Sequence, residues 1–341
     1  MGVTRQIKVG ILTAPHIEFE QRANTFILKN VRIGIGFHWD RYEDQEFAGT
    51  LTIRNNADGT QTAINTIDLE DYLCSVISSE MSANSPIELL KAHAVISRSW
   101  AIRAMQKPNH EGFDVCADDH CQRYEGLRRM SERAVEAVRA TAGQVLLYND
   151  EICDCRYYKC CGGKTEIWRT CWEDIDVPYI QSVQCDYCKS PSPKILRLVL
   201  NDYDRETKDF RDWKVTYKDE ELNEIIRTKS GIDFGEIIDL IPLHRGASGR
   251  IDQLRIVGTK HTEVIGKELK IRYWLSRSCL YSSWFEVAHE NGVWTLSGHG
   301  WGHGAGLCQI GAAVMATEGK TYEEILTYYY PGTRLNEKMR K

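Results

Sequence analysis

The sequence predicts an α+β fold of mixed helices and antiparallel strands, and three observations support this prediction. Residues 1–66 are short apolar runs broken by Gly, Asn and Asp, which is typical of strands. Residues 67–105 then carry apolar side chains at helical spacing. Residues 190–290 then look like a less regular α+β segment that contains several strand-like runs.

The N-terminal elements follow from local signals. Strands are expected in IKVGIL, TFILKN, VRIGIGF and GTLTIRN. A first helix is expected in TIDLEDYLCSVIS, with Asp68 as its N-cap. Ser85 as N-cap and Pro86 at the first helical position begin a second helix, which Pro108 stops. A third helix in SERAVEAVRAT ends at Gly143.

The later elements are assigned in the same way. QVLLYN, CDCRYYKC, GRIDQLRIVG, TEVIGKELKIRY and WFEVAHENGVWTLSGHG predict strands, whereas DFRDWKVTYKDEELNEIIRTK predicts a strand and then a helix. The C-terminal segment GAAVMATEGKTYEEILTYYYPGT predicts helix. We expect four parts: a β-rich segment at 1–60, a helical part at 61–189, an α+β subdomain at 190–290, and a Gly/His-rich motif with the C-terminal helix at 291–341.

Composition narrows the class of function. The 341 residues are 42% hydrophobic and 27% charged, as in a globular protein. A net charge of −5 argues against a dedicated nucleic-acid binder and suits an anionic membrane surface poorly. No run reaches about 18 apolar residues, so no transmembrane segment is expected. The N-terminus lacks the apolar region of a signal peptide, so either the protein stays in the cytosol or an export signal has been removed.

Twelve cysteines are many for a cytosolic chain of this size, and most are clustered. His110, Cys116, His120 and Cys121 supply two nitrogen and two sulfur donors within twelve residues, which suits a tetrahedral zinc ion. Four protein ligands leave no position for water, so this zinc would be structural. A Cys116–Cys121 disulfide is the alternative if the protein is exported.

A second group of cysteines is less easily assigned. Cys185 and Cys188 have the spacing of a zinc knuckle, and Cys160 and Cys161 precede GGKTE. Either a second metal joins these residues or disulfides connect the two segments. Adjacent residues of a strand point to opposite faces, so Cys160 and Cys161 would rarely bind the same metal.

Two polar motifs attract attention. Glu80 lies in SVISSEMSANSP, in an expected loop between helices, without a positive side chain within four residues. A carboxyl group held in a groove without a cationic neighbour would keep the raised pKa that an acid catalyst needs; a solvated surface glutamate is the alternative. GHGWGHGAG has five glycines within residues 298–306, which permit close backbone approach. No P-loop Lys-Ser/Thr follows it, which excludes nucleotide binding of that kind.

Taken together, six motifs in order resemble the SpoIID/LytB family of stage II sporulation protein D and the amidase enhancers. They are SSEMSANSPIELLKAHAVISRSWAI, CADDHCQRYEG, CCGGKTE, SGRIDQLRIVG, SSWFEV and GHGWGHGAGLCQIGAAVMATEGKTYEEILTYYYPGT. The resemblance covers roughly residues 60–335, and residues 1–60 carry no assignable motif.

The resemblance implies a SpoIID-like fold around a catalytic groove, with the activity of a peptidoglycan lytic transglycosylase. Such an enzyme, a glycan lyase, cleaves the MurNAc–GlcNAc bond and leaves 1,6-anhydro-MurNAc ends. Glu80 occupies the position of the family's catalytic acid, and family members carry a Cys/His zinc site that corresponds to His110, Cys116, His120 and Cys121. Expected substrate contacts are Arg98, Lys164, Trp301, His303 and Gln309.

Several alternatives stay open at this point. Arg98 could instead form a structural salt bridge, His303 could be structural, and Lys164 could lie in an exposed turn. The rival function is a non-catalytic cell-wall protein, an amidase enhancer that binds glycan or an amidase; a zinc hydrolase is disfavoured by the filled ligand shell. The expected partners are peptidoglycan glycan strands and a cell-wall amidase, and the expected location is the cell envelope if an export signal has been removed.

Overall fold

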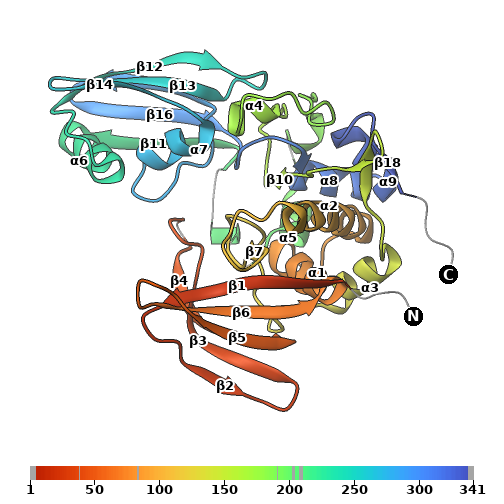
Figure 1. Cartoon of the computed structure of the whole chain (residues 1–341). Helices are drawn as coiled ribbons and strands as arrows, with labels where there is room; N and C mark the ends of the chain where they lie inside the picture. The colour runs from red at the N-terminus through yellow and green to blue at the C-terminus, as the bar shows by residue number, and fades with distance from the viewer. Residues whose placement is uncertain are drawn as a thin grey trace.

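The computed structural model describes residues 5–37, 39–82, 84–189, 191–201, 204–206 and 210–336. Figure 1 shows N-terminal sheets below a central group of helices, and a second lobe of strands and helices above the sheets. Most strand pairs are antiparallel, and the helices do not connect successive parallel strands of one sheet. The α+β class predicted from the sequence is therefore confirmed.

Two sheets form the N-terminal part. Their strands, in the spatial orders β5-β6-β1-β7 and β2-β3-β4, are β1 (Gln6–Ala14), β2 (Phe19–Gln21), β3 (Thr25–Ile33), β4 (Arg41–Ala48), β5 (Thr50–Asn55), β6 (Gln61–Asp68) and β7 (Val115–Cys116). The two strands expected in TFILKNVRIGIGF are one strand, β3. Its register shifts between Leu28 and Val31, where Asn30 adopts a positive φ of 53°. Asn is common in turns, so its presence predicts the end of a strand, although here the strand continues through it.

Three helices follow: α1 (Leu69–Glu80), α2 (Ile87–Gln106) and α3 (Glu132–Ala140). Asp68 caps α1 as predicted, because its side chain accepts a hydrogen bond from the backbone of Glu70. Glu80 is the last residue of α1, so the prediction that it lies in a loop is wrong. The second helix begins one residue later than predicted, with Pro86 as its N-cap.

Short elements connect the helices to the second lobe. They are β8 (Leu146–Tyr148), β9 (Glu151–Ile152), β10 (Tyr157–Tyr158), α4 (Trp168–Cys171), η1 (Asp186–Cys188), α5 (Pro193–Val199) and η2 (Asp204–Glu206). The strand expected in CDCRYYKC is reduced to β10, which pairs in parallel with β17 (Leu307–Cys308). This pairing joins segments about 150 residues apart along the chain.

The second lobe has its own hydrophobic core, whose members run from Trp213 to Leu296. Its elements are β11 (Asp212–Lys218), α6 (Asp219–Ser230), β12 (Ile237–Arg245), β13 (Ile251–Gly258), β14 (Thr262–Ile265), α7 (Glu268–Trp274), β15 (Phe285–Glu290) and β16 (Val293–His299). The prediction of a strand throughout TEVIGKELKIRY is wrong, since α7 begins at Glu268. Ile271 and Trp274 are buried one helical turn apart.

The chain then returns to the first lobe through α8 (Gln309–Thr317), α9 (Tyr322–Tyr329) and β18 (Arg334–Leu335). Both helices pack against α2, which is consequently surrounded by helices. Among the residues described, no helix is both long and apolar enough to cross a membrane. The boundaries at 60/61, 189/190 and 290/291 stay a proposal.

Candidate active site

A cavity of about 1580 Å³ lies between the N-terminal sheets, the C-terminal end of α1 and the second lobe. Residues of β1 and β3 line one side, and Leu269, Arg272 and Tyr273 of α7 line another. Pockets for small molecules are usually about 300–1,000 Å³. This cavity therefore has room for a segment of a polymer.

Glu80 lies in this cavity at the end of α1, and only 8% of the residue is exposed. Its Oε1 accepts hydrogen bonds from the hydroxyl of Tyr157 (3.0 Å) and the backbone N–H of Arg123 (3.1 Å). Burial is the main cause that raises the pKa of Glu80 above that of an ordinary glutamate. The carboxyl group is thus both fixed in position and biased toward its protonated form.

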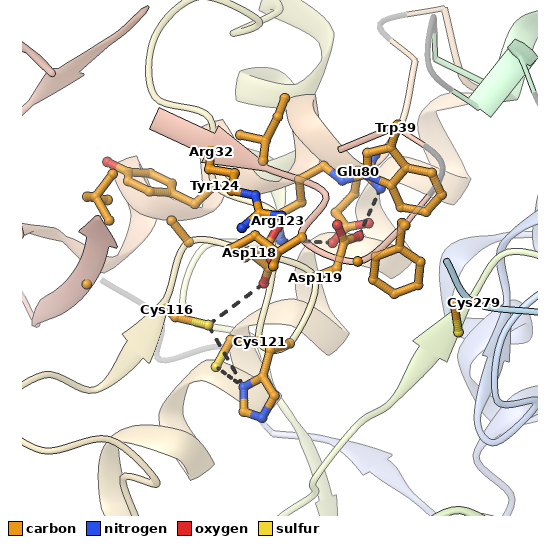
Figure 2. A pocket seen from close by; sticks show the side chains of 18 of the residues that line it. Arg32, Trp39, Glu80, Cys116, Asp118, Asp119, Cys121, Arg123, Tyr124 and Cys279 are labelled. Atoms are coloured by element: carbon orange, nitrogen blue, oxygen red, sulfur yellow. Dashed lines mark hydrogen bonds and ion pairs between the residues drawn. The ribbon is translucent and has the colours of Figure 1, made fainter. Parts of the chain in front are cut away.

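The expectation that Glu80 has no cationic neighbour is wrong. Lys159 donates to the backbone oxygen of Glu80 at 3.3 Å and to Oδ2 of Asp204 at 2.6 Å. Arg123 pairs with Oδ1 of Asp119 at 2.9 Å, close to Glu80 in Figure 2. Both cations lower the pKa of Glu80, but each has an acidic partner, and desolvation outweighs them. The tertiary fold supplies these neighbours, which a four-residue window cannot reveal.

His110, Cys116, His120 and Cys121 come together as the spacing predicts, with their ligand atoms all within 4.8 Å of one another. Nε2 of His110 lies 3.2 Å from Sγ of Cys121, and Nδ1 of His120 lies 3.6 Å from it. Two imidazoles and two thiols are a donor set typical of tetrahedral zinc, so these residues could hold that metal. All twelve cysteines are free thiols here, and the alternative Cys116–Cys121 disulfide is not formed.

The metal-site turn, residues 116–123, connects this cluster to Glu80. Cys116 lies on β7 at the edge of the first sheet, and the backbone N–H of Cys121 closes the turn onto the carbonyl of Asp118 (3.0 Å). Two residues later, the N–H of Arg123 reaches the Glu80 carboxylate. Figure 2 shows both cysteines and Glu80 in the same pocket. Whatever fixes the cluster therefore also fixes a hydrogen-bond donor to Glu80.

His303 lines the cavity, but both of its ring nitrogens already have backbone partners. Nδ1 accepts from the N–H of Ala305 (3.1 Å), so Nε2 carries the proton and donates to the carbonyl of Tyr157 (3.0 Å). Burial, with Arg156 as the next cause, holds the pKa of His303 well below its ordinary value. A neutral His303 thus positions Tyr157 rather than offering a free nitrogen to a ligand.

The alternating glycines of residues 298–306 serve a similar internal purpose. A Cβ at Gly300 would lie 2.9 Å from the carbonyl oxygen of Cys160, and one at Gly302 would lie 2.7 Å from Cβ of Tyr158. Both glycines have positive φ. The close approach that these glycines permit is to the protein's own segment around β10.

The remaining aromatic candidates differ in exposure. Trp301 is 5% exposed and packs against Phe210, with Lys159 Nζ 5.9 Å from its ring centre. A stacking platform needs an accessible ring face. Tyr42 (64% exposed) and Tyr273 (42% exposed) also line the cavity and offer such faces. The sequence analysis missed both, because nothing local distinguishes a platform tyrosine from a core one.

Gln309 begins α8 and is almost completely buried. Its Nε2 lies 2.9 Å from Nε2 of His93, whose pKa burial lowers to about 3. A neutral His93 accepts from Gln309 and contacts the ring of Tyr157 edge-on. Oε1 of Gln309 has no hydrogen-bond partner among the residues described. It is therefore a buried acceptor in the cavity wall.

Arg98 does not line the cavity. Its guanidinium is 1% exposed and binds both carboxylate oxygens of Glu70 (2.8 and 2.6 Å) and the carbonyl of Gln144 (3.0 Å). These bonds connect α1, α2 and the segment after α3. The structural salt bridge left open as an alternative accounts for Arg98, so we do not carry it into the proposed site.

Replacing Arg98 by Met is expected to destabilise the protein by about 1.5–3 kcal/mol, the scale of hydrogen bonds to a charged group. Glycan binding should not change, since Arg98 lies outside the cavity. Urea unfolding and sedimentation with insoluble peptidoglycan measure the two effects. Arg103→Met, on the less buried last turn of the same helix, is the control. Weaker binding at unchanged stability would return Arg98 to the substrate contacts.

Lys164 also lies away from the cavity lining. Its backbone forms an isolated antiparallel β-bridge with Gln184. The neighbouring Glu166 is fully buried and accepts from the backbone and hydroxyl of Ser248 (2.9 and 2.5 Å). The GGKTE motif therefore attaches the second lobe to the first.

The second cysteine cluster differs from the expected one. Cys160 is not among its members, although its thiol contacts those of Cys188 and Cys308, and Cys308 takes the fourth place. The members are Cys161, Cys185, Cys188 and Cys308. The sequence analysis missed Cys308, although it lies directly before Gln309 in the motif already singled out.

This geometry defines a class of protein: a two-lobed α+β protein that holds a buried carboxyl group and a His/Cys cluster in one cavity. Residues 57–148 match the SpoIID family model, described as stage II sporulation protein, and residues 166–306 match a domain of unknown function. The first match includes Glu80 and all four residues of the His/Cys cluster. Residues 57–148 therefore form a SpoIID domain, and the resemblance to the SpoIID family that the motifs indicated is confirmed.

Relatives extend the similarity beyond that domain. Stage II sporulation protein D of Bacillus subtilis (strain 168) is 29% identical over 290 residues, which cover 81% of this chain and 76% of the relative. The protein of the same name from Bacillus amyloliquefaciens is 26% identical, over 81% of this chain and 76% of the relative. The amidase enhancer of B. subtilis (strain 168) is 26% identical over 77% of this chain but only 40% of its own length.

Proposed function

We propose that this protein is a peptidoglycan lytic transglycosylase. It cleaves the bond between MurNAc and GlcNAc and leaves 1,6-anhydro-MurNAc ends. The observation that carries the proposal is the carboxyl group of Glu80, which is buried with a raised pKa at the end of α1, in a cavity large enough for a glycan strand. Similarity to stage II sporulation protein D supports it.

Glu80 acts first as an acid and then as a base. Its protonated carboxyl gives the proton to the leaving glycosidic oxygen as the bond to the anomeric carbon breaks. The resulting carboxylate takes the proton of the 6-hydroxyl of the same MurNAc, whose oxygen bonds to that carbon. No water is consumed, so the second carboxylate that a hydrolase uses is not required. Glu80 ends the cycle protonated again.

Two donors orient the acid for this exchange. Tyr157 and the N–H of Arg123 both bind Oε1 of Glu80, which leaves Oε2 as the oxygen that carries the transferable proton. His303 fixes the backbone of Tyr157, so it acts as a positioning residue. Tyr42 and Tyr273 are the accessible rings on which sugars stack.

The metal at His110, Cys116, His120 and Cys121 is zinc in this proposal. Four protein ligands fill a tetrahedral shell and leave no site for an activated water. The ion is therefore structural and holds the metal-site turn, which carries the Arg123 donor. The partners are glycan strands and the location is the cell envelope.

Product analysis in heavy-oxygen water tests the reaction. Purified peptidoglycan is digested, and the released fragments are weighed by mass spectrometry. A transglycosylase gives anhydro ends that are one water lighter than hydrolysed ends and contain no heavy oxygen. Incorporation of heavy oxygen at the new ends would instead indicate a hydrolase, with Asp119, whose charge raises the pKa of Glu80, as a candidate for the second carboxylate.

A second candidate function is favoured by the similarity to the amidase enhancer. In that case the cavity binds glycan without cutting it, and the protein stimulates a cell-wall amidase. The same digestion distinguishes the two. An unchanged glycan, together with faster stem-peptide release when an amidase is added, would replace the transglycosylase proposal with the enhancer.

Replacing Tyr157 by Phe is expected to slow cleavage by about 3–10-fold, the value of one hydrogen bond. The hydroxyl stabilises the charged form of Glu80, so its removal raises the pKa of Glu80 further. The acid must be protonated, and the rate falls as pH rises through that pKa. The high-pH limb of the rate profile should therefore move to higher pH.

Rate profiles of the wild type and the variant measure this shift. Tyr158→Phe is the control, because the Tyr158 hydroxyl has no partner among the residues described. A Tyr157→Phe profile that coincides with that of the wild type would contradict the assigned contact.

A further inference from the structure

We propose that Cys161, Cys185, Cys188 and Cys308 bind a second, structural zinc ion. This site is separate from the His/Cys cluster and does not depend on the proposed reaction. Its four Sγ atoms all lie within 4.8 Å of one another, and each residue is at most 1% exposed.

The arrangement of the sulfur atoms favours a metal over disulfides. Four sulfurs about 2.3 Å from one ion at tetrahedral corners lie about 3.8 Å apart. Two disulfides would require two close pairs but no proximity between the pairs. Here all four atoms converge, and even the close pair Cys161 and Cys188 is 3.0 Å apart, beyond bonding distance. All four residues are free thiols.

Hydrogen-bond donors point at the sulfurs, as they do around metal-bound thiolates. Sγ of Cys308 accepts from the N–H groups of Cys161 (3.3 Å) and Gly311 (3.4 Å). Sγ of Cys161 accepts from Gly163 at 3.4 Å, and the Tyr329 hydroxyl lies 3.2 Å from Sγ of Cys185. These donors offset the negative charge that four thiolates bring to one divalent ion.

Gly311 shows how closely the site is packed. A Cβ at this position would lie 2.8 Å from Sγ of Cys185 and 2.3 Å from the hydroxyl oxygen of Tyr329. The first turn of α8 can approach the cluster only because this residue has no side chain. On the side of α8, the backbone therefore packs directly against the sulfur atoms.

The position of the site indicates its role. Cys161 follows β10. Cys185 precedes η1 and Cys188 is its last residue, while Cys308 is the last residue of β17 and the N-cap of α8. The ion therefore connects three segments that are distant in sequence. It fixes the pairing of β10 with β17, which sets the place of Tyr157 in the cavity wall. We expect zinc binding here to stabilise that wall, because metal binding is coupled to folding.

Metal content of the full chain tests the proposal directly. The wild type is expected to contain about two zinc ions per chain, one for each four-ligand set. Cys308→Ser should contain about one, and the serine hydroxyl can still cap α8. Cys74→Ser is the matched control: it removes a buried thiol that belongs to neither cluster and should keep both ions.

A variant of the His/Cys cluster, the first metal site, tests the proposal if Cys308→Ser fails to fold. Cys116→Ser/Cys121→Ser disables the His/Cys cluster, so X-ray absorption then reports only on the remaining ion. Four sulfur ligands at about 2.3 Å are expected. A first-site variant without metal, iron in the remaining site, or a non-reducing peptide map with a Cys161–Cys188 disulfide would each overturn the zinc assignment. None of these readouts needs cleavage of glycan.

Discussion

Replacing Glu80 by Gln is expected to abolish the release of anhydro-ended fragments from peptidoglycan. Loss of general acid–base help usually costs about 10²–10⁴-fold in rate. The loss should reach at least the upper end here, because the same group serves both steps of the proposed reaction. An amide neither donates the proton to the leaving oxygen nor accepts the one from the 6-hydroxyl.

The fold should tolerate this change. The amide oxygen can still accept from Tyr157 and from the N–H of Arg123, so both bonds to Oε1 persist. Thermal unfolding and sedimentation with peptidoglycan are expected to match the wild type. Glu18→Gln, at an exposed position on the cavity rim, is the control for losing one carboxylate. Cleavage by Glu80→Gln at the wild-type rate would remove Glu80 from the mechanism.

The sequence predicted the parts of the site that lie close together along the chain. His110 to Cys121 span twelve residues, so their spacing alone brings four ligands together. The neighbours of Glu80 are different. Tyr157 is 77 residues away and Lys159 is 79, and only the folded chain brings them to one carboxyl group. A local window therefore predicted an isolated acid, whereas in the structure Glu80 has cationic neighbours and accepts hydrogen bonds.

Distance along the chain also explains the misassigned polar residues. Arg98 and His303 have the chemistry of substrate contacts, but Glu70 occupies the donors of Arg98, and the backbone of Tyr157 and Ala305 occupies the donor and the acceptor of His303. Sequence reports which groups can form hydrogen bonds, and the fold decides which of them remain available.

Errors in the elements have a similar origin. The helix α7 was predicted as strand because it follows β14 after only two residues. A short apolar run does not distinguish the spacing of a helix from the alternation of a strand. The strand β3 was divided because Asn30 resembles a turn residue, although a bulge accommodates it. In both places long-range packing outweighed a local signal.

The second large effect is expected from the His/Cys cluster. Cys121→Ser should lower the zinc content by about one ion per chain and destabilise the fold. An ion present at about 1,000 times its dissociation constant stabilises a protein by about 4 kcal/mol. At about 2 °C per kcal/mol for a large domain, the unfolding midpoint should fall by about 8 °C. Elemental analysis and thermal unfolding measure the two changes on the same sample.

Cleavage should fall together with the metal, although the ion takes no part in the reaction. Arg123, whose N–H orients Glu80, follows Cys121 by two residues, so a loosened turn misplaces that donor. Loss of a supporting interaction around a site typically costs about 10–100-fold. Cys279→Ser is the matched control, since Cys279 lines the same cavity but belongs to neither cluster, as Figure 2 shows for the His/Cys cluster. A metal-free wild type with an unchanged midpoint, or a Cys116–Cys121 disulfide in its peptide map, would mean that the cluster is not a zinc site.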